Sequence, residues 1–406
     1  MITLADVHAA RARMGAAIYC SPCAYSETVS RMAGARVAFK LDNLQMTGSF
    51  KERGALNKLL SLGADERVRG VITASAGNHG LAVAFHAQRL GVRATIVMPR
   101  FAPLVKVSWA QRYGAEVVLT GTDFDEALAE AQRLQRERGS VFIPAFDDPY
   151  VIAGQGTLGL ELLEQAPEMD AVLVPVGGGG LIGGVAVALK ESGFGGRVIG
   201  VQAERLPGMK RALQAGAPVA LSPASTIADG IAVRKVGDLT LPLVRRYVDD
   251  ITTVSETELA HAILLLLENE KTVVEGAAAT TLAALLNRPL QLAGRTVVLV
   301  LSGGNIDVNV IARVIEKGLV QEGRLVRLSL IVPDRPGALA RVCTLVADQG
   351  ANIQEIAHTR GFSRAEIGES EITLTLETHG PAHITRVVTA LRAAGYQVLT
   401  ERSGPP

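Results

Sequence analysis

Short runs of β-branched residues alternate with amphipathic stretches of helical length from about residue 36 to residue 317. Strands that alternate with helices in this way predict an α/β protein with open parallel sheets in two lobes. Two such lobes would leave a cleft where the carboxyl ends of their strands meet. The expected strands lie at 68–75, 93–99, 115–121 and 141–146 in a first series, and at 171–176, 197–204 and within 295–305 in a second.

The pattern changes near residue 325. Residues 325–402 read as strand, helix, strand, strand, helix, strand, with turns at Pro-Gly and Gly-Ala-Asn sequences. This βαββαβ order predicts a second domain. The segment 317–324, "KGLVQEGR", is the expected linker that joins it to a first domain at 1–320.

Charge and composition argue against several classes of protein. The 406 residues carry 41 Lys and Arg against 40 Asp and Glu, and aromatic residues make up 4%. A balanced charge gives no sign of nucleic-acid binding, and few aromatics weaken a case for base stacking. The apolar runs are too short to cross a membrane, and the amphipathic N-terminus lacks a signal-peptide core. We therefore expect a cytoplasmic protein.

Four consecutive glycines, 177–180, follow a predicted strand and open a helix. Backbone N–H groups at such a helix start can converge on a phosphate. Gly178, Gly180 and Gly183 also satisfy G-x-G-x-x-G, and Glu204 follows about one βαβ step later, so an NAD-dependent enzyme is an alternative. The glycine run favours phosphate binding whichever ligand carries the phosphate.

One lysine, in "GSFKERGA" (48–55), is delivered by a loop to the start of a helix. "SAGNHG" (75–80) and "SGGN" (302–305) each follow a strand and offer small polar groups at anion-binding positions. Together these features fit a ligand with a phosphate, a ring nitrogen and an aldehyde. Pyridoxal 5'-phosphate fits because Lys51 can form a Schiff base with it, whereas NAD gives that lysine no comparable covalent task.

With these motifs, "VIAGQGT" (151–157) and "TIADGIAV" (226–233), the chain resembles threonine ammonia-lyases of pyridoxal-phosphate fold type II from about residue 16 to 320. The resemblance implies a tryptophan-synthase-β-like catalytic domain, with a small lobe at about 46–148 inserted in a large lobe. "VPDRPGAL…GANI" resembles an ACT domain, an amino-acid-sensing module. The implied activity is deamination of L-threonine to 2-oxobutanoate and ammonia, and of L-serine to pyruvate, under control of the ACT domain.

The same resemblance assigns roles around the cofactor. Lys51 would be the Schiff-base lysine and the base for the α-proton, with Phe50 against the cofactor. Asn78 would bond the phenolic oxygen, and Ser302 would face the pyridine nitrogen. A hydroxyl cannot keep that nitrogen protonated, which favours elimination over transamination. The phosphate would be held by Gly177, Gly178, Gly179, Gly180 and the backbone of Leu181.

The loop 75–79 is expected to grip the substrate carboxylate. Ser75 would lie nearest the chemistry, and its neighbours in the loop are Ala76, Gly77, Asn78 and His79. Cysteine-synthase-like enzymes usually carry Thr where this chain has His79, and this difference argues against that class. Serine racemases also resemble this chain, so a serine racemase/dehydratase is an alternative, but they place a second hydroxyl at the position of Ala76, where this chain offers no evident acid. A catalytically inactive amino-acid sensor is another.

No metal is expected. Some relatives bind a divalent cation through an acidic residue after "IGV", where this chain has Gln202. Cys20 and Cys23 form one CxxC with no second pair, and we interpret them as small apolar residues. Glu275 could either be a charge at a helix N-terminus or approach the cofactor cleft, and the sequence does not choose.

For regulation, the resemblance points to a site formed by two ACT domains side by side. Asp334 and Gly337 come from the "DRPGA" turn, and Asn352 begins the strand expected opposite it. Ligand binding there can change activity only if it differs between two states of an oligomer. We therefore expect a homodimer or homotetramer and a branched-chain effector such as isoleucine or valine.

Overall fold

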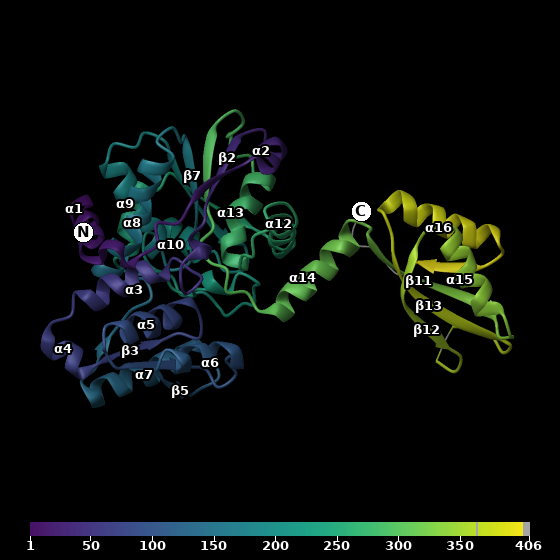
Figure 1. Cartoon of the computed structure of the whole chain (residues 1–406), viewed down its shortest axis with the longest axis horizontal. Coiled ribbons are helices and arrows are strands. Elements are labelled where there is room, and N and C mark those ends of the chain that lie inside the picture. The colour runs from purple at the N-terminus through teal and green to yellow at the C-terminus, as the bar shows by residue number, and fades with distance from the viewer. Residues whose placement is uncertain (363, 401–406) are drawn as a thin grey trace. The chain divides into compact units, whose positions relative to one another are not determined.

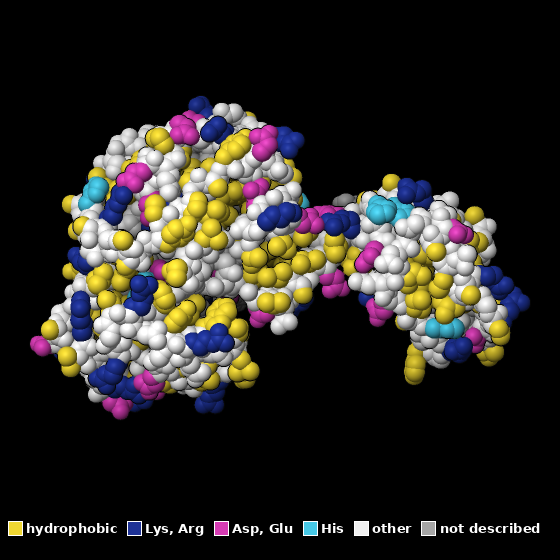
Figure 2. Space-filling view, viewed as in Figure 1, with side chains coloured by type: hydrophobic (Ala, Val, Ile, Leu, Met, Phe, Trp, Pro, Cys, Tyr) yellow, Lys and Arg dark blue, Asp and Glu magenta, His cyan; other side chains and the backbone are white. Residues whose placement is uncertain are grey.

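The computed structural model describes residues 1–362 and 364–400. The chain divides into two compact units, Met1–Asp307 and a second that starts at Val308 (Figure 1). No helix of the described residues is long and apolar enough to span a membrane. On the face seen in Figure 2, acidic and basic side chains are interspersed, as the balanced composition suggests.

The large sheet of the first unit has six strands in the order β1-β2-β10-β7-β8-β9. All neighbouring pairs are parallel except β1 with β2, so the expected parallel sheet carries one antiparallel edge strand. The strands are β1 Cys23–Ser26, β2 Arg36–Lys40, β7 Ala171–Pro175, β8 Arg197–Ala203, β9 Asp250–Val254 and β10 Thr296–Val300.

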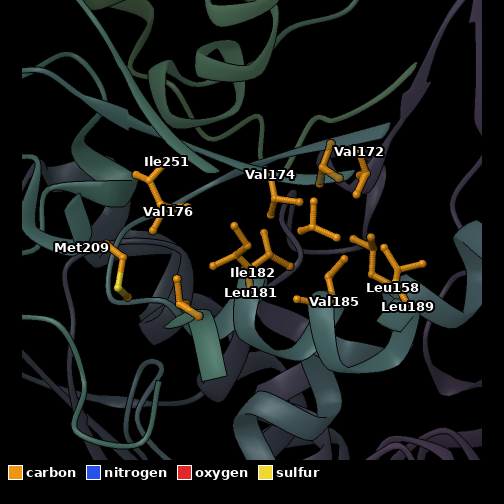
Figure 3. Close-up of a cluster of buried hydrophobic side chains, with 14 of the residues drawn as sticks. Leu158, Val172, Val174, Val176, Leu181, Ile182, Val185, Leu189, Met209 and Ile251 are labelled. Carbon is orange, nitrogen blue, oxygen red and sulfur yellow. The ribbon is translucent and has the colours of Figure 1, made fainter. Parts of the chain in front are cut away.

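Helix α9 (Gly180–Glu191) packs on strand β7, and Figure 3 shows its Leu181, Ile182 and Val185 pointing at the side chains of the strand. All of these side chains are almost fully buried. Each contributes about 1.5–3 kcal/mol relative to an exposed position. This packing holds the N-terminus of α9, and with it the glycine run, at the carboxyl end of the sheet.

The small lobe has four parallel strands in the order β5-β4-β3-β6. Helix α7 packs on Ile72, Ala74 and Val97, whereas α5 and α6 pack on the opposite face. Strand β6 covers only Val141–Phe142, so the expected strand 141–146 is wrong over residues 143–146. The elements are β3 Val71–Ala74, β4 Ala94–Met98, β5 Glu116–Leu119, α5 Asn78–Arg89, α6 Leu104–Arg112 and α7 Phe124–Arg138.

The strands of the large sheet come from chain segments on both sides of the small lobe. The other helices of this unit cover the two lobes or connect them. They are α1 Leu4–Met14, α2 Glu27–Ala33, α3 Lys51–Leu60, α4 Ala64–Arg69, α8 Pro149–Gln165, α10 Gly208–Ala215, α11 Thr240–Tyr247, α12 Glu256–Asn269 and α13 Gly276–Asn287.

The second unit begins with α14 (Val308–Gln321), so the segment 317–324 is helical over more than half of its length. An antiparallel sheet of order β12-β13-β11-β14 follows, and α15 and α16 share its core. The elements are β11 Leu325–Pro333, α15 Ala338–Asp348, β12 Asn352–Thr359, β13 Glu369–Glu377, α16 Pro381–Ala393 and β14 Gln397–Thr400. This is the expected βαββαβ order.

Candidate active site

Lys51 is the first residue of α3, and the loop before it turns through Gly48, whose φ is +73°. Its Nζ donates a hydrogen bond to the carbonyl oxygen of Ala145 at 2.8 Å and lies 5.2 Å from the centre of the Phe50 ring. Burial lowers the pKa of this amine to about 8, although the charge of Glu275 acts in the opposite direction. A lysine with this pKa has a substantial neutral fraction near physiological pH.

The loop before Lys51 is joined to the end of strand β10. The backbone N–H of Phe50 donates to the carbonyl oxygen of Ser302 at 2.9 Å, and Ser49 forms an isolated β-bridge with Gly303. Ser302 is buried. The "GSFK" and "SGGN" motifs, about 250 residues apart in the sequence, are therefore neighbours in the structure.

The glycine run lies against Phe146. A Cβ on Gly178 would lie 2.5 Å from three atoms of the Phe146 ring, and one on Gly180 would lie 2.9 Å from Phe146 Cβ. Gly179 has φ +97°, a left-handed conformation that side chains other than glycine disfavour. These positions require glycine, and they leave backbone N–H groups at the start of α9 without intrahelical partners. Phe146 follows Ala145, which accepts the bond from Lys51.

A second contact holds the glycine run from the other side. The Thr240 hydroxyl donates to the carbonyl oxygen of Gly178 at 2.6 Å. Asp147 in turn accepts hydrogen bonds from the backbone N–H groups of residues 238–240, which gives α11 an N-terminal cap from a distant segment. The sequence contains no short-range pattern that links Asp147 to Thr240, and our sequence analysis missed both.

Glu275 precedes α13, but its carboxylate does not cap that helix. Both oxygens instead accept hydrogen bonds from Asn78 Nδ2 at 2.9 Å. Burial raises the pKa of Glu275 to about 7; Asp229 also raises it, whereas the bond from Asn78 lowers it. Glu275 thus stands at the N-terminus of α13, and its carboxylate is directed at Asn78, one of the residues expected at the cofactor.

Asn305, the last residue of "SGGN", donates to Asn78 Oδ1 at 2.8 Å and to the carbonyl oxygen of Thr47 at 2.7 Å. Its role was not predicted from the sequence, although its motif was. A polar residue directly after two glycines at a strand end was the available signal.

His79 is buried, and its Nε2 lies 2.9 Å from the carbonyl oxygen of Ile143, so that nitrogen carries the proton. Burial and the charge of Lys51 lower its pKa to about 3, which keeps the ring neutral. The Ser75 hydroxyl accepts from the N–H of Gly77 at 3.2 Å, and Ala76 lies between these two residues, half-buried. The loop thus ends at the N-terminus of α5, where backbone N–H groups favour an anion.

Two residues after Lys51, the side chain of Arg53 is completely buried. It donates to Asp42 at 2.7 and 2.8 Å and to Glu161 at 2.5 and 2.9 Å. Lys40, also inaccessible, donates to the same Glu161 at 2.5 Å. Two cations and two carboxylates therefore balance one another and tie the start of α3 to β2 and α8. The sequence analysis missed this cluster.

Two remaining expectations concern Gln202 and the CxxC. The Gln202 amide donates to the carbonyl oxygen of Val176 at 3.1 Å and accepts from the N–H of Lys210 at 3.0 Å, so it joins three backbone segments. Cys20 and Cys23 are free thiols, and burial raises the pKa of both. A raised pKa makes a thiol less reactive.

In the second unit, Asp334 pairs with Arg360 at 2.7 and 3.0 Å, and Gly337 begins α15 in a left-handed conformation. Asn352 bonds Glu377 at 2.9 Å. Pro333 pairs with Glu369 and Leu325 with Glu377, so Asp334 and Asn352 lie at opposite ends of the sheet. One domain does not bring them together.

The residues around Lys51 fit pyridoxal 5'-phosphate. Gly177–Gly180 form a cradle that side chains would fill, with Gly178 and Gly180 against Phe146, and the partly neutral Lys51 amine bonds the preceding residue, Ala145. The second nitrogen of His79 is buried without a hydrogen-bond partner in the described part of the chain, as is the hydroxyl of Ser49.

Comparison with known proteins agrees with this fit. The chain is 49% identical to an L-threonine ammonia-lyase of Thermotoga maritima over 98% of this chain and 99% of that one. The crystal structure of a T.th. threonine deaminase is 44% identical with a TM-score of 0.71, over 75% of this chain and 99% of that chain. A maize serine racemase is 35% identical with a TM-score of 0.74, over 78% and 98%.

Two family models match separate parts of the chain, one described as an ACT domain at residues 326–393 and one as a pyridoxal-phosphate dependent enzyme at residues 16–303. The chain belongs to the pyridoxal-phosphate dependent enzymes and ends in an ACT domain.

Proposed function

We propose that the protein is an L-threonine ammonia-lyase that forms 2-oxobutanoate and ammonia, and that also converts L-serine to pyruvate. The 49% identity to the Thermotoga protein over nearly the whole of both chains supports the substrate class. One observation supports the reaction type. The Lys51 amine donates a hydrogen bond to the carbonyl oxygen of Ala145, and the next residue, Phe146, packs on the glycine run. The NAD-dependent alternative is set aside, because the family uses a different cofactor.

In this proposal, Gly177–Gly180 and the backbone N–H of Leu181 hold the phosphate at the N-terminus of α9. Asn78 would donate to the ring oxygen, Phe50 would pack beside the ring, and Ser302 would face the ring nitrogen. Bound pyridoxal 5'-phosphate supplies a sink for the electrons of the substrate's α-carbon.

Lys51 takes the α-proton. A base is most effective when its pKa lies near the working pH, and a pKa of about 8 meets that condition. The carbonyl oxygen of Ala145 accepts a hydrogen bond from Nζ and so orients the amine. This bond uses one N–H of the neutral amine, which leaves its lone pair to accept the proton.

Residues 75–79 bind the substrate carboxylate through backbone N–H groups at the start of α5. His79 stays neutral at physiological pH, so the attraction comes from the helix N-terminus rather than from an imidazolium. Ser75 lies nearest the reacting carbon in this arrangement.

Serine racemisation is the second candidate, supported by the likeness to the maize enzyme. It needs an acid on the face opposite Lys51, and Ala76 offers none at the expected position. Elimination is also favoured by Ser302, because a hydroxyl cannot hold a proton on the ring nitrogen as a carboxylate would.

The ACT domain implies an amino-acid effector. We propose a branched-chain amino acid, isoleucine or valine, and a homodimer or homotetramer that responds to it. A cytoplasmic location completes the proposal.

One assay tests the activity. Purified protein with pyridoxal 5'-phosphate should release 2-oxobutanoate and ammonia from L-threonine in equal amounts, and D-serine should not accumulate from L-serine. A yellow protein without turnover would point to a sensor. D-Serine as the main product would favour the racemase.

A further inference from the structure

Three polar side chains form one hydrogen-bonded chain: Asn305, Asn78 and Glu275. The chain starts at the carbonyl oxygen of Thr47, which accepts from Asn305 Nδ2 at 2.7 Å. A carbonyl oxygen can only accept, so the Asn305 amide can face it only with its nitrogen. The orientation of the first amide is therefore determined by the backbone.

The orientation of the second amide follows from the first. Asn305 Nδ2 also donates to Asn78 Oδ1 at 2.8 Å, so Asn78 must turn its nitrogen to the other side. There it meets both oxygens of Glu275 at 2.9 Å. An amide nitrogen carries two hydrogens, and the Glu275 carboxylate accepts from one of them. The remaining N–H of Asn78 is free to bond an acceptor in the cleft.

The carboxylate of Glu275 occupies a slot between two glycines. A Cβ on Gly303 would overlap Oε1, and one on Gly230 would lie 2.9 Å from it. Gly230 belongs to "TIADGIAV" and Gly303 to "SGGN", two motifs whose glycines have no other role in the proposed mechanism. Both glycines leave room for this side chain.

Because Glu275 is buried, it fixes the orientation of the Asn78 amide that a ligand would meet. Glu275 is 3% exposed, and its pKa is raised, so its position costs free energy that a surface carboxylate would not. If Asn78 were turned by 180°, its carbonyl oxygen would face an acceptor oxygen and the two would repel each other. The hydrogen-bond chain excludes that orientation.

We infer that Glu275 and Asn305 are positioning residues that hold the Asn78 carboxamide with one Nδ2–H directed at the ring oxygen of pyridoxal 5'-phosphate. This inference rests on the proposed function. Neither residue touches the reacting atoms; both act through Asn78.

The test is a titration of pyridoxal 5'-phosphate into cofactor-free protein, followed by its visible absorbance. Glu275→Ala and Asn305→Ala should each weaken binding about tenfold, the effect of one lost hydrogen bond to a charged acceptor. Glu275→Gln keeps an acceptor for Asn78 Nδ2 and should recover most of the affinity. Asn287→Ala, which removes an amide at the far end of α13, is the matched control and should bind like the wild type.

The outcomes separate the two proposals. If wild-type protein binds no pyridoxal 5'-phosphate, the proposed function itself fails. The positioning inference is overturned if the wild type binds it and both alanine variants bind it as tightly as the wild type. It is also overturned if Glu275→Gln loses as much affinity as Glu275→Ala. Circular dichroism of the cofactor-free variants shows whether they fold; should Glu275→Ala not fold, Asn305→Ala and Glu275→Gln decide.

Discussion

The side-chain nitrogen of Lys51 donates to the carbonyl oxygen of Ala145 at 2.8 Å, and the next residue, Phe146, packs on the glycine run. One dipeptide thus contacts both the amine proposed to react and the loop proposed to hold phosphate. It lies just beyond strand β6, in residues 143–146, which were expected to be strand but are not. The chain bends at Ala145 and Phe146, and the Ala145 carbonyl takes no part in the sheet pairing of β6.

Lys51→Ala should abolish release of 2-oxobutanoate and the visible band of lysine-bound cofactor, while the melting temperature of the cofactor-free protein changes little. Lys235→Ala, an exposed lysine in the same unit, is the control. Turnover at the wild-type rate in Lys51→Ala would contradict the assignment of Lys51 as the reacting lysine.

The pH dependence of the same residue gives a second measurement. Only a neutral amine attacks an aldehyde, so the rate at which cofactor-free protein binds pyridoxal 5'-phosphate should rise with pH, with a midpoint at about 8. Glu275→Gln should move this midpoint lower, because the charge of Glu275 raises the pKa of Lys51. A midpoint at about 10.4, the value of an exposed lysine, would contradict the effect of burial.

Gly178→Ala should weaken cofactor binding by about tenfold or more, because the new Cβ would lie 2.5 Å from the Phe146 ring and displace it or the loop. Gly183→Ala is the matched control on the same helix, since its Cβ would make an ordinary contact with Leu243 at 3.6 Å. Binding is measured by absorbance and folding by thermal denaturation. Equal loss in the two variants would mean that helix stability, and not the cradle, is affected.

Arg53→Met should destabilise the protein by about 3–5 kcal/mol, because Asp42 and Glu161 would be left buried with only Lys40 to balance them. Denaturant unfolding measures this loss. Arg133→Met, which breaks exposed pairs with Glu130 and Glu137, should leave the unfolding midpoint unchanged. An equally small change in the unfolding midpoint of Arg53→Met would show that the buried ion pairs make no net contribution to the free energy of unfolding.

The alternation of strands and helices was predictable because it depends on short-range periodicity. The expected strand 93–99 corresponds to β4, and the expected 171–176 to β7. Motifs at strand ends could also be found, because parallel strands bring their carboxyl ends to one edge. The antiparallel strand β1 was not predicted, since its four residues carry no clear alternation.

The supporting residues could not be predicted from sequence. Asp147 caps α11 from about 90 positions away, and Arg53 meets Glu161 across a similar separation. Such pairs depend on tertiary proximity, and a single sequence offers no signal for them. Glu275 was noticed but remained ambiguous, because a carboxylate before a helix is equally compatible with capping.

Ala76→Ser should add detectable D-serine formation from L-serine to the existing elimination. The substitution places a hydroxyl in the loop between Ser75 and Gly77, on the face expected to lie opposite Lys51. Chiral chromatography measures the product, and Ala76→Val, which adds bulk without a proton donor, is the control. If serine only slows dehydration, as valine does, a missing acid does not explain the choice of reaction.

The last prediction concerns the effector. Truncation after Gly323 should leave threonine turnover intact and remove its response to isoleucine or valine. Retained sensitivity would locate the regulatory site in the catalytic unit.

Point variants define that site more closely. Asp334 and Asn352 lie at opposite ends of one sheet, so a site that uses both must combine two copies of the chain. Asp334→Ala and Asn352→Ala should each abolish the response. Co-expression of the two variants should restore part of it, because in a mixed dimer one of two sites receives both wild-type residues. If co-expression restores nothing while the mixed dimers form, the two residues act within one chain or not at all.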